Sequence, residues 1–350
     1  MSNTIEIQGK KIGVGHPTYI IAEISANHNQ NIQEAIDLIN IAAECGADAV
    51  KIQTYTPDTM TLDCKSDHFV IGKGSIWEGR NVYELYEDAY TPWEWLPELQ
   101  AAAKDAGITI FSTPFDASSV DFLEAHDVPA HKIASFELTD LPLLKKVAQT
   151  GKPVIMSTGM GSLGEVYQAV ETMKSNGCEQ LVLLKCTSAY PAPADEANLK
   201  RIPHMKEAFG VDVGLSDHTM GSIVPALAVS VGAVIVEKHF TKSRSIPGPD
   251  SAFSLEPDEL KAMIDAVRVA EKAMGKVTYD LTEKEISSRK FRRSIFASKD
   301  IAEGEPLTIE NVKVVRPSDG LEPQYFEEIL TRRATQNIPF GSPISWDLVT

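Results

Sequence analysis

Short apolar runs alternate with amphipathic stretches along most of the chain. Eight runs rich in β-branched residues predict strands, at residues 19–23, 49–53, 109–112, 131–133, 153–157, 180–185, 211–216 and 233–238. Apolar residues at helical spacing predict helices at residues 32–45, 93–106, 118–125, 141–150, 164–176, 222–231 and 257–274. Eight alternations over about 260 residues predict an α/β fold, a (β/α)8 TIM barrel, rather than an open doubly wound sheet.

Two features interrupt this regular pattern. Residues 54–91 form a long insertion after the second strand, and a loop of that length is typical of a lid or a subunit contact. Beyond residue 276 the chain becomes polar and then shows short strand-like pieces with frequent Pro and Gly. We therefore expect a barrel at 1–276, a linker at 277–289 and a small second domain at 290–350. A domain of about 60 residues is only marginally stable alone, so it is expected to lean on another surface.

The charge balance excludes several kinds of partner. The chain carries 33 Lys and Arg residues against 49 Asp and Glu residues, a formal charge of −16. Such a surface repels nucleic acid and anionic membranes, so neither is expected as a partner. The amino terminus lacks the apolar core of a signal peptide, and four scattered cysteines form no C-x-x-C pair. These features predict a cytoplasmic protein with reduced thiols.

Polar residues gather at the carboxyl ends of the predicted strands, where barrels of this kind carry their chemistry. These ends combine ammonium groups with hydroxyl groups, from Lys51, Lys132, Lys185, Thr113, Ser135, Ser157 and Ser216. That combination is suited to hold a phosphate and a carboxylate together. The alternative for any single lysine is an ion pair with a neighbouring glutamate.

His218 and His239 follow adjacent strands, so their imidazoles can share one cation across a strand spacing of about 4.8 Å. A cation held by two imidazoles and few carboxylates keeps coordination positions for water and a substrate oxygen, as a Lewis-acid site requires. We therefore predict a metal site at this pair. The nearby carboxylates are candidates for proton transfer or for binding a substrate hydroxyl, namely Glu23, Glu137, Asp217, Glu237 and Asp250.

Strings throughout the chain resemble the sialic acid synthase family, also called the nonulosonic acid synthase family. They are IIAEISANHN (20–29), DAVKIQTYTPD (48–58), FSTPF (111–115), HKIASFE (131–137), STGM (157–160), KCTSAYP (185–191), GLSDHT (214–219), VEKHF (236–240) and PGPDSAFSLEPDEL (247–260). The tail strings KFRRSIFASKDIAEGEPLT (290–308) and VVRPSDGLEP (314–323) resemble the antifreeze-like domain, or SAF domain, of that family. The resemblance implies a TIM-barrel transferase that condenses phosphoenolpyruvate with an amino sugar and releases phosphate.

Within this family the pseudaminic acid synthase branch is the most similar. The indications include EISANHN, QTYTPDTMTL, LYEDAYTPWEW, the KCT string and DSAFSLEPDEL. This branch implies 2,4-diacetamido-2,4,6-trideoxy-L-altrose as the sugar. An N-acetylneuraminic or legionaminic acid synthase remains the alternative.

The resemblance also implies roles for single residues. His218 and His239 would hold a divalent cation, Mn²⁺, Mg²⁺ or Co²⁺, which polarises the sugar aldehyde. Positions that match the phosphoenolpyruvate site are Lys51, Gln53, Thr113, Lys132, Ser135, Ser157 and Ser216, and those near the sugar are Glu23, Glu137, Tyr190 and Asp250. Glu23, Lys51 and Lys132 join the two histidines as the expected catalytic set. Ser188 stands where sialic acid synthases often have Asn.

Arg316 matches the arginine that the small domain of one subunit sends into the barrel of the other, which implies a domain-swapped homodimer. Two other classes compete with this prediction. A metal-dependent aldolase, or another phosphoenolpyruvate-condensing synthase, would share the barrel and the lysines. A glycan-binding or ice-binding protein built around the small domain would need neither the lysines nor the ion.

Overall fold

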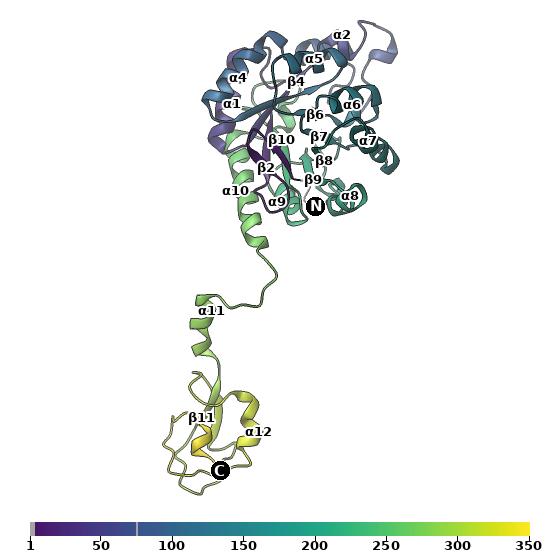
Figure 1. Cartoon of the computed structure of the whole chain (residues 1–350). Helices are drawn as coiled ribbons and strands as arrows, with labels where there is room; N and C mark the ends of the chain where they lie inside the picture. Colours follow the sequence, from purple (N-terminus) through teal and green to yellow (C-terminus); the bar gives the residue numbers. More distant parts are fainter. Residues whose placement is uncertain (1–3, 75) are drawn as a thin grey trace. The chain divides into compact units, whose positions relative to one another are not determined.

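The computed structural model describes residues 4–74 and 76–350, which form two compact units that divide after Gly275 (Figure 1). In the first unit, the described residues include a closed barrel of eight parallel strands: β3 (Tyr19–Glu23), β4 (Ala49–Thr54), β5 (Thr109–Pro114), β6 (His131–Ile133), β7 (Val154–Ser157), β8 (Leu181–Cys186), β9 (Asp212–Asp217) and β10 (Ile235–His239). Strands β10 and β3 close the barrel, with His239 opposite Glu23. This architecture confirms the predicted TIM barrel.

Helices surround the strands on the outside of the barrel (Figure 1). They are α1 (Ile32–Cys45), α4 (Leu96–Asp105), α5 (Ala117–Ala125), α6 (Leu141–Ala148), α7 (Leu163–Ser175), α8 (Arg201–Phe209), α9 (Ile223–Ser230) and α10 (Pro257–Met274). Helix α8 was not predicted, because Pro203 interrupts its short apolar pattern. Proline is tolerated in the first turn of a helix, where backbone N–H groups have no helical partner. Within the part of the chain that the structure describes, no helix is long and apolar enough to cross a membrane.

The pleat of the strands decides which side chains enter the barrel. Ile21, Phe111, Val182, Leu184 and further alternate residues pack together inside it, while the residues between them pack under the helices. Because successive side chains point to opposite faces, the residue two positions after an interior one faces the interior again. Near the carboxyl ends of the strands, such residues line the open end of the barrel. We call that open end the mouth.

A hairpin covers the other end of the barrel. Strands β1 (Ile5–Ile7) and β2 (Lys10–Ile12) pair in antiparallel fashion, and their apolar residues pack against the barrel interior. The turn between them consists of Gln8 and Gly9, with φ angles of 47° and 79°. Two consecutive positive φ values are typical of the tight hairpin turn that glycine favours. The sequence pattern did not predict this hairpin.

The described part of the insertion, residues 54–74 and 76–91, is folded. It contains helices α2 (Pro57–Met60) and α3 (Val82–Ala89) and the 3₁₀ turn η1 (Asp67–Phe69). The Nε1 atom of Trp77 donates a hydrogen bond to Pro249 O at 3.0 Å, which attaches the insertion to the loop after β10. The insertion thus stands at the mouth rather than against the outer helices.

The second unit has its own small core. Strands β11 (Ser294–Ala297) and β12 (Val312–Val315) pair in antiparallel fashion, and helices α11 (Glu283–Ser288) and α12 (Phe326–Ile329) accompany them. Buried residues such as Ile295, Leu307 and Ile344 form the core. Arg316, directly after β12, is exposed.

Candidate active site

Two lysines and two glutamates meet at the bottom of the mouth. We call them the charged floor: Glu23, Lys51, Lys132 and Glu237. Lys51 Nζ lies 2.5 Å from Glu23 Oε2 and 3.2 Å from Glu237 Oε1. Lys132 Nζ lies 3.7 Å from the same oxygen of Glu237. All four are buried, and burial lowers the pKa of Lys51 to about 8. Each predicted lysine of the floor is therefore near a carboxylate as well as near the other lysine.

Hydroxyl groups surround these charges. Lys132 Nζ donates to Ser157 Oγ at 2.7 Å, and Lys51 Nζ donates to Thr113 Oγ1 at 3.3 Å. Ser216 Oγ donates to Glu237 Oε1 at 3.3 Å, and Gln53 Nε2 donates to Glu23 Oε1 at 3.5 Å. The barrel thus brings these hydroxyl groups and this amide into contact with the charged floor, as their positions at strand ends predict.

Lys185 does not join this cluster, and its predicted place in the basic set is wrong. Leu184 faces the barrel interior and Leu183 the outer helices, so the pleat turns Lys185 outward. Its ammonium group donates to Thr187 Oγ1 and to Glu196 O. Asp217 is also excluded from the mouth, because it pairs with Lys238 at 2.5 Å on the outer side.

His218 and His239 face each other in the mouth, with ring centroids 5.3 Å apart. The Nδ1 atom of His218 donates a hydrogen bond to the carbonyl oxygen of Thr187 at 2.8 Å, so Nε2 is the ring nitrogen that could bind a cation. Burial and the charges of His218 and the nearby lysines hold the pKa of His239 well below its usual value, so its imidazole is neutral. Its Nδ1 atom is buried and has no hydrogen-bond partner among the described residues.

Cys186 also lies in the mouth, although it was not predicted as a site residue. Its Sγ lies 3.9 Å from His218 Nδ1 and 3.9 Å from Ser188 Oγ. Burial raises the pKa of the thiol, but His218, Ser135 and Lys132 lower it by more, to about 7. The available signal was the alternation with Leu184, which places Cys186 on the interior face.

Ser135 and Ser188 both approach the backbone after β7. A Cβ atom at Gly159 would lie 2.3 Å from Ser188 Oγ and 2.5 Å from Ser135 Oγ. Glycine is therefore required here by close approach of the two hydroxyl groups. Ser135 is buried at the start of the 3₁₀ turn η3 (Ser135–Thr139), which follows β6.

A cavity of about 360 Å³ opens beside His239. Its polar residues include Glu137, Tyr190 and Asp250, which were predicted to contact the sugar. The remaining lining residues are mostly apolar or aromatic, and many belong to the insertion. The lining consists of Gln53, Tyr55, Met60, Ile71, Trp77, Val82, Leu85, Tyr86, Ala89, Phe115, Ala134, Phe136, Glu137, Tyr190, His239, Pro249 and Asp250. The aromatic and aliphatic members of the insertion were not identified as site residues, because their side chains show no strand-end pattern.

Two carboxyl groups in this cavity have raised pKa values. Burial raises the pKa of Glu137 to about 7, and its buried Oε2 atom has no hydrogen-bond partner among the residues described. Burial raises the pKa of Asp250 to about 6, although Ser25 Oγ and Ala26 N donate to it. The ring of Tyr190 lies 4.4 Å from that of His218 and 5.8 Å from that of Trp77, so it links the histidines to the insertion.

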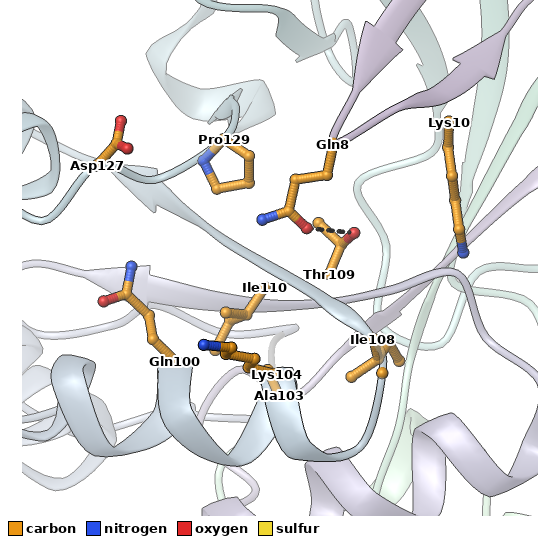
Figure 2. A pocket seen from close by; sticks show the side chains of 11 residues that line it. Gln8, Lys10, Gln100, Ala103, Lys104, Ile108, Thr109, Ile110, Asp127 and Pro129 are labelled. Atoms are coloured by element: carbon orange, nitrogen blue, oxygen red, sulfur yellow. Dashed lines mark hydrogen bonds between the residues drawn. The ribbon is translucent and has the colours of Figure 1, made fainter.

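Another cavity, of about 390 Å³, lies at the amino end of β5 (Figure 2). Gln8, from the hairpin turn, accepts a hydrogen bond from Thr109 Oγ1 at 2.9 Å beside it. Gln100 and Lys104 of α4 form part of its lining. Because it is at the end of the barrel opposite the mouth, it has no part in the site described above.

Comparison with known proteins identifies the family. Residues 38–279 match the model of the NeuB family, and residues 292–350 match that of the SAF domain. A pseudaminic acid synthase of Campylobacter jejuni is 48% identical over 93% of this chain and 95% of its own length. That of Helicobacter pylori is 43% identical over 95% of this chain and 97% of its own length.

A solved structure shares the whole architecture. The spore coat polysaccharide biosynthesis protein SpsE of Bacillus subtilis superposes with a TM-score of 0.68 at 34% identity, over 99% of both chains. The family model covers more than half of the chain, and the resemblance drawn from the sequence is confirmed. The chain therefore belongs to the NeuB family.

Proposed function

We propose that the protein is a pseudaminic acid synthase, which condenses phosphoenolpyruvate with 2,4-diacetamido-2,4,6-trideoxy-L-altrose and releases phosphate. The observation that carries this function is similarity along nearly the whole chain to pseudaminic acid synthases, at 43–48% identity. The site supports this function chemically, because the charged floor and its hydroxyl partners lie beside a cavity with two carboxyl groups. A glycan-binding or ice-binding protein would need no such buried charges.

The charged floor would bind phosphoenolpyruvate. Lys51 and Lys132 would hold its phosphate and carboxylate, and hydroxyl groups such as Thr113, Ser135, Ser157 and Ser216 would add hydrogen bonds, with Gln53 beside them. In the free protein Glu23 and Glu237 neutralise the two lysines. An anionic substrate would therefore compete with these carboxylates for the ammonium groups.

His218 and His239 fit a divalent cation such as Mn²⁺, Mg²⁺ or Co²⁺. His218 has one nitrogen hydrogen-bonded to a carbonyl group, and His239 is neutral and has a buried nitrogen that finds no partner in residues 4–74 and 76–350. A bound cation would supply Lewis-acid polarisation of the sugar aldehyde. No group of three or more His, Cys, Asp or Glu side chains within residues 4–74 and 76–350 is arranged to hold a metal ion. Water or substrate oxygens would complete the coordination.

The reaction joins carbon three of phosphoenolpyruvate to the aldehyde carbon of the open-chain sugar. Water then adds at carbon two, and phosphate leaves by cleavage of its carbon–oxygen bond. Lys51 and Lys132 would fix the substrate and stabilise its negative charge during these steps. Glu23, held by Lys51 and Gln53, would carry a proton or order the attacking water. Glu137, Tyr190 and Asp250 would contact the sugar.

The second unit would complete the site of another subunit. In this proposal residues 1–276 are the catalytic domain, residues 277–289 the linker, and residues 290–350 the SAF domain. The exposed Arg316 would enter the mouth of the partner, so that the active enzyme is a domain-swapped homodimer. The formal net charge of −16 supports the prediction that neither nucleic acid nor a membrane is a partner. A cytoplasmic location stays a prediction.

Product analysis tests the function directly. The full chain would be incubated with phosphoenolpyruvate, Mn²⁺ and one of three amino sugars, namely the diacetamido-trideoxy-L-altrose, its legionaminic counterpart or N-acetylmannosamine. We expect mass spectrometry to detect a nine-carbon acid, with one phosphate released per product, chiefly from the first sugar. Preferred turnover of either other sugar would assign the alternative synthase, and the same product formed from pyruvate in place of phosphoenolpyruvate, with no phosphate released, would indicate an aldolase.

A further inference from the structure

The insertion gives the cavity beside His239 an aliphatic wall, formed by Met60, Ile71, Val82, Leu85 and Ala89. None of these five side chains carries a hydrogen-bond donor. Val82, Leu85 and Ala89 all belong to α3, and Leu85 is buried. The wall is therefore suited to an apolar group and offers little to a hydroxyl group.

The wall is held in place by contacts of its own segment. Ile71 N donates to Arg80 O at 2.9 Å, and Gly79 N donates to Ile71 O at 2.9 Å. The Nδ2 atom of Asn81, which caps α3, donates to Cys64 O at 2.9 Å. These contacts order the wall within the insertion, and the hydrogen bond from Trp77 to Pro249 attaches the insertion to the rest of the mouth. Such a wall can exclude a substituent as well as accept one.

Three polar residues of the cavity lie at or just after strand ends, whereas Tyr86 of α3 adds a phenol group on the insertion side. His239 ends β10, Gln53 lies on β4, and Glu137 lies in the turn after β6. A sugar that reacts at its aldehyde must place carbon one near the histidines and the charged floor. Carbon six is at the other end of the open chain, so an extended sugar held in this way would direct it away from the strand ends, toward the insertion.

We infer that the aliphatic wall of the insertion receives carbon six of the sugar and selects substrates in which that carbon is a methyl group. The inference rests on the proposed function and adds a specificity determinant to it. A hydroxyl group on carbon six that packs against these five side chains would lose water without gaining a hydrogen bond from them, although Tyr86 also lines the cavity. Apolar pockets discriminate against one added hydroxyl group by about 10²-fold.

Two sugars that differ only at carbon six provide the test. They are 2,4-diacetamido-2,4,6-trideoxy-L-altrose and its 6-hydroxy counterpart, each assayed with phosphoenolpyruvate and Mn²⁺. In the unchanged full chain we expect kcat/KM to favour the 6-deoxy sugar by about 10²-fold. Val82→Thr replaces one methyl group by a hydroxyl group at nearly constant shape, and Met60→Gln is a second near-isosteric change. Each is expected to reduce the discrimination by about tenfold and to leave the KM for phosphoenolpyruvate unchanged.

Leu62→Gln is the matched control, because Leu62 belongs to the same insertion but is 66% exposed and lies outside the cavity lining. It should retain the discrimination of the unchanged chain. Thermal unfolding of each variant would show that the fold is intact, and Met60→Gln serves if Val82→Thr does not fold. Equal turnover of both sugars by the unchanged chain, or full discrimination in both folded variants, would overturn the inference and leave the synthase function standing. Absence of turnover with either sugar would overturn both.

Discussion

Glu237 Oε1 lies 3.2 Å from Lys51 Nζ, although their strands, β10 and β4, are not neighbours in the barrel. The same oxygen lies 3.7 Å from Lys132 Nζ on β6. Although burial raises the pKa of Glu237, the two lysines lower it by more, so the carboxylate stays charged. One carboxylate thus holds together the two cations that we assign to phosphoenolpyruvate.

The pH dependence of phosphoenolpyruvate use should report on this contact. Burial lowers the pKa of Lys51 to about 8, and Glu237 opposes that shift. We expect kcat/KM for phosphoenolpyruvate to fall above about pH 8, as Lys51 loses its proton. In Glu237→Gln the fall should begin at a lower pH, because the opposing charge is removed. Glu207→Gln, on the exposed surface of α8, should leave the profile unchanged, and an unshifted profile in Glu237→Gln would contradict the assignment.

Lys132 and Lys185 should behave differently on substitution, although both were expected in the basic set. Lys132→Met removes a cation of the charged floor, so we expect kcat/KM for phosphoenolpyruvate to fall by about 10²-fold, as for a lost charge-assisted hydrogen bond of about 3 kcal/mol. Lys185→Met changes a side chain that faces away from the mouth, so the folded fraction should keep its KM. Steady-state kinetics checks both. A larger effect at Lys185 on the KM for phosphoenolpyruvate would restore it to the site.

Metal binding should depend on His239. We expect His239→Ala to weaken Mn²⁺ binding at least about tenfold, since a ligand should matter no less than a second-shell partner. Isothermal titration of the substrate-free protein measures this without an activity assay. His16→Ala, at an exposed histidine, is the control and should bind as the unchanged chain does. Equal affinity in His239→Ala would remove the metal site from the proposal.

Glu137 should make stability depend on pH. Burial raises its pKa from 4.5 to about 7, so the folded state binds more protons than the unfolded state between these values. The free energy of unfolding should therefore fall as pH rises through this window. Glu137→Gln lacks this penalty, and we expect it to be more stable than the unchanged chain at pH 8 by about 1–3 kcal/mol but not at pH 4.5. Urea unfolding at both pH values measures the difference.

The same variant should bind the sugar less well. Because Glu137 lines the cavity and is not part of the charged floor, we expect the sugar KM to rise while the KM for phosphoenolpyruvate stays the same. An equal rise in both KM values would place Glu137 outside the sugar site. No pH-dependent difference in stability would show that its carboxyl group is solvated.

Arg316 should act on the barrel of a partner subunit. We expect Arg316→Ala and His239→Ala each to be nearly inactive alone. Refolded together, they should form heterodimers in which one of the two sites has both residues, and activity should return. Arg293→Ala is the control, since Arg293 is an exposed arginine of the same unit, and it should remain active alone. Failure of the mixture to regain activity, with dimers verified by light scattering, would contradict the domain swap.

In a barrel of parallel strands, residues at the carboxyl ends of the strands meet at one mouth, and this rule accounts for how much of the site was predictable. Glu23, Lys51, Lys132, His218 and His239 were identified because parallel strands of one barrel end at the same mouth. The rule failed for Lys185, since it counts a residue near the end of a strand without asking which face the pleat gives it. The same alternation would have included Cys186, which shares the interior face with Leu184.

The eight alternations of strand and helix, the family strings and the chemical kinds of residue at the strand ends can all be read from the chain alone, because periodicity and local composition are properties of the chain. Folding was needed to show that Glu237 reaches two lysines on distant strands and that the insertion forms an aliphatic wall beside His239. These contacts join residues far apart along the chain. Their geometry depends on the closure and pleat of the barrel, which no local pattern encodes.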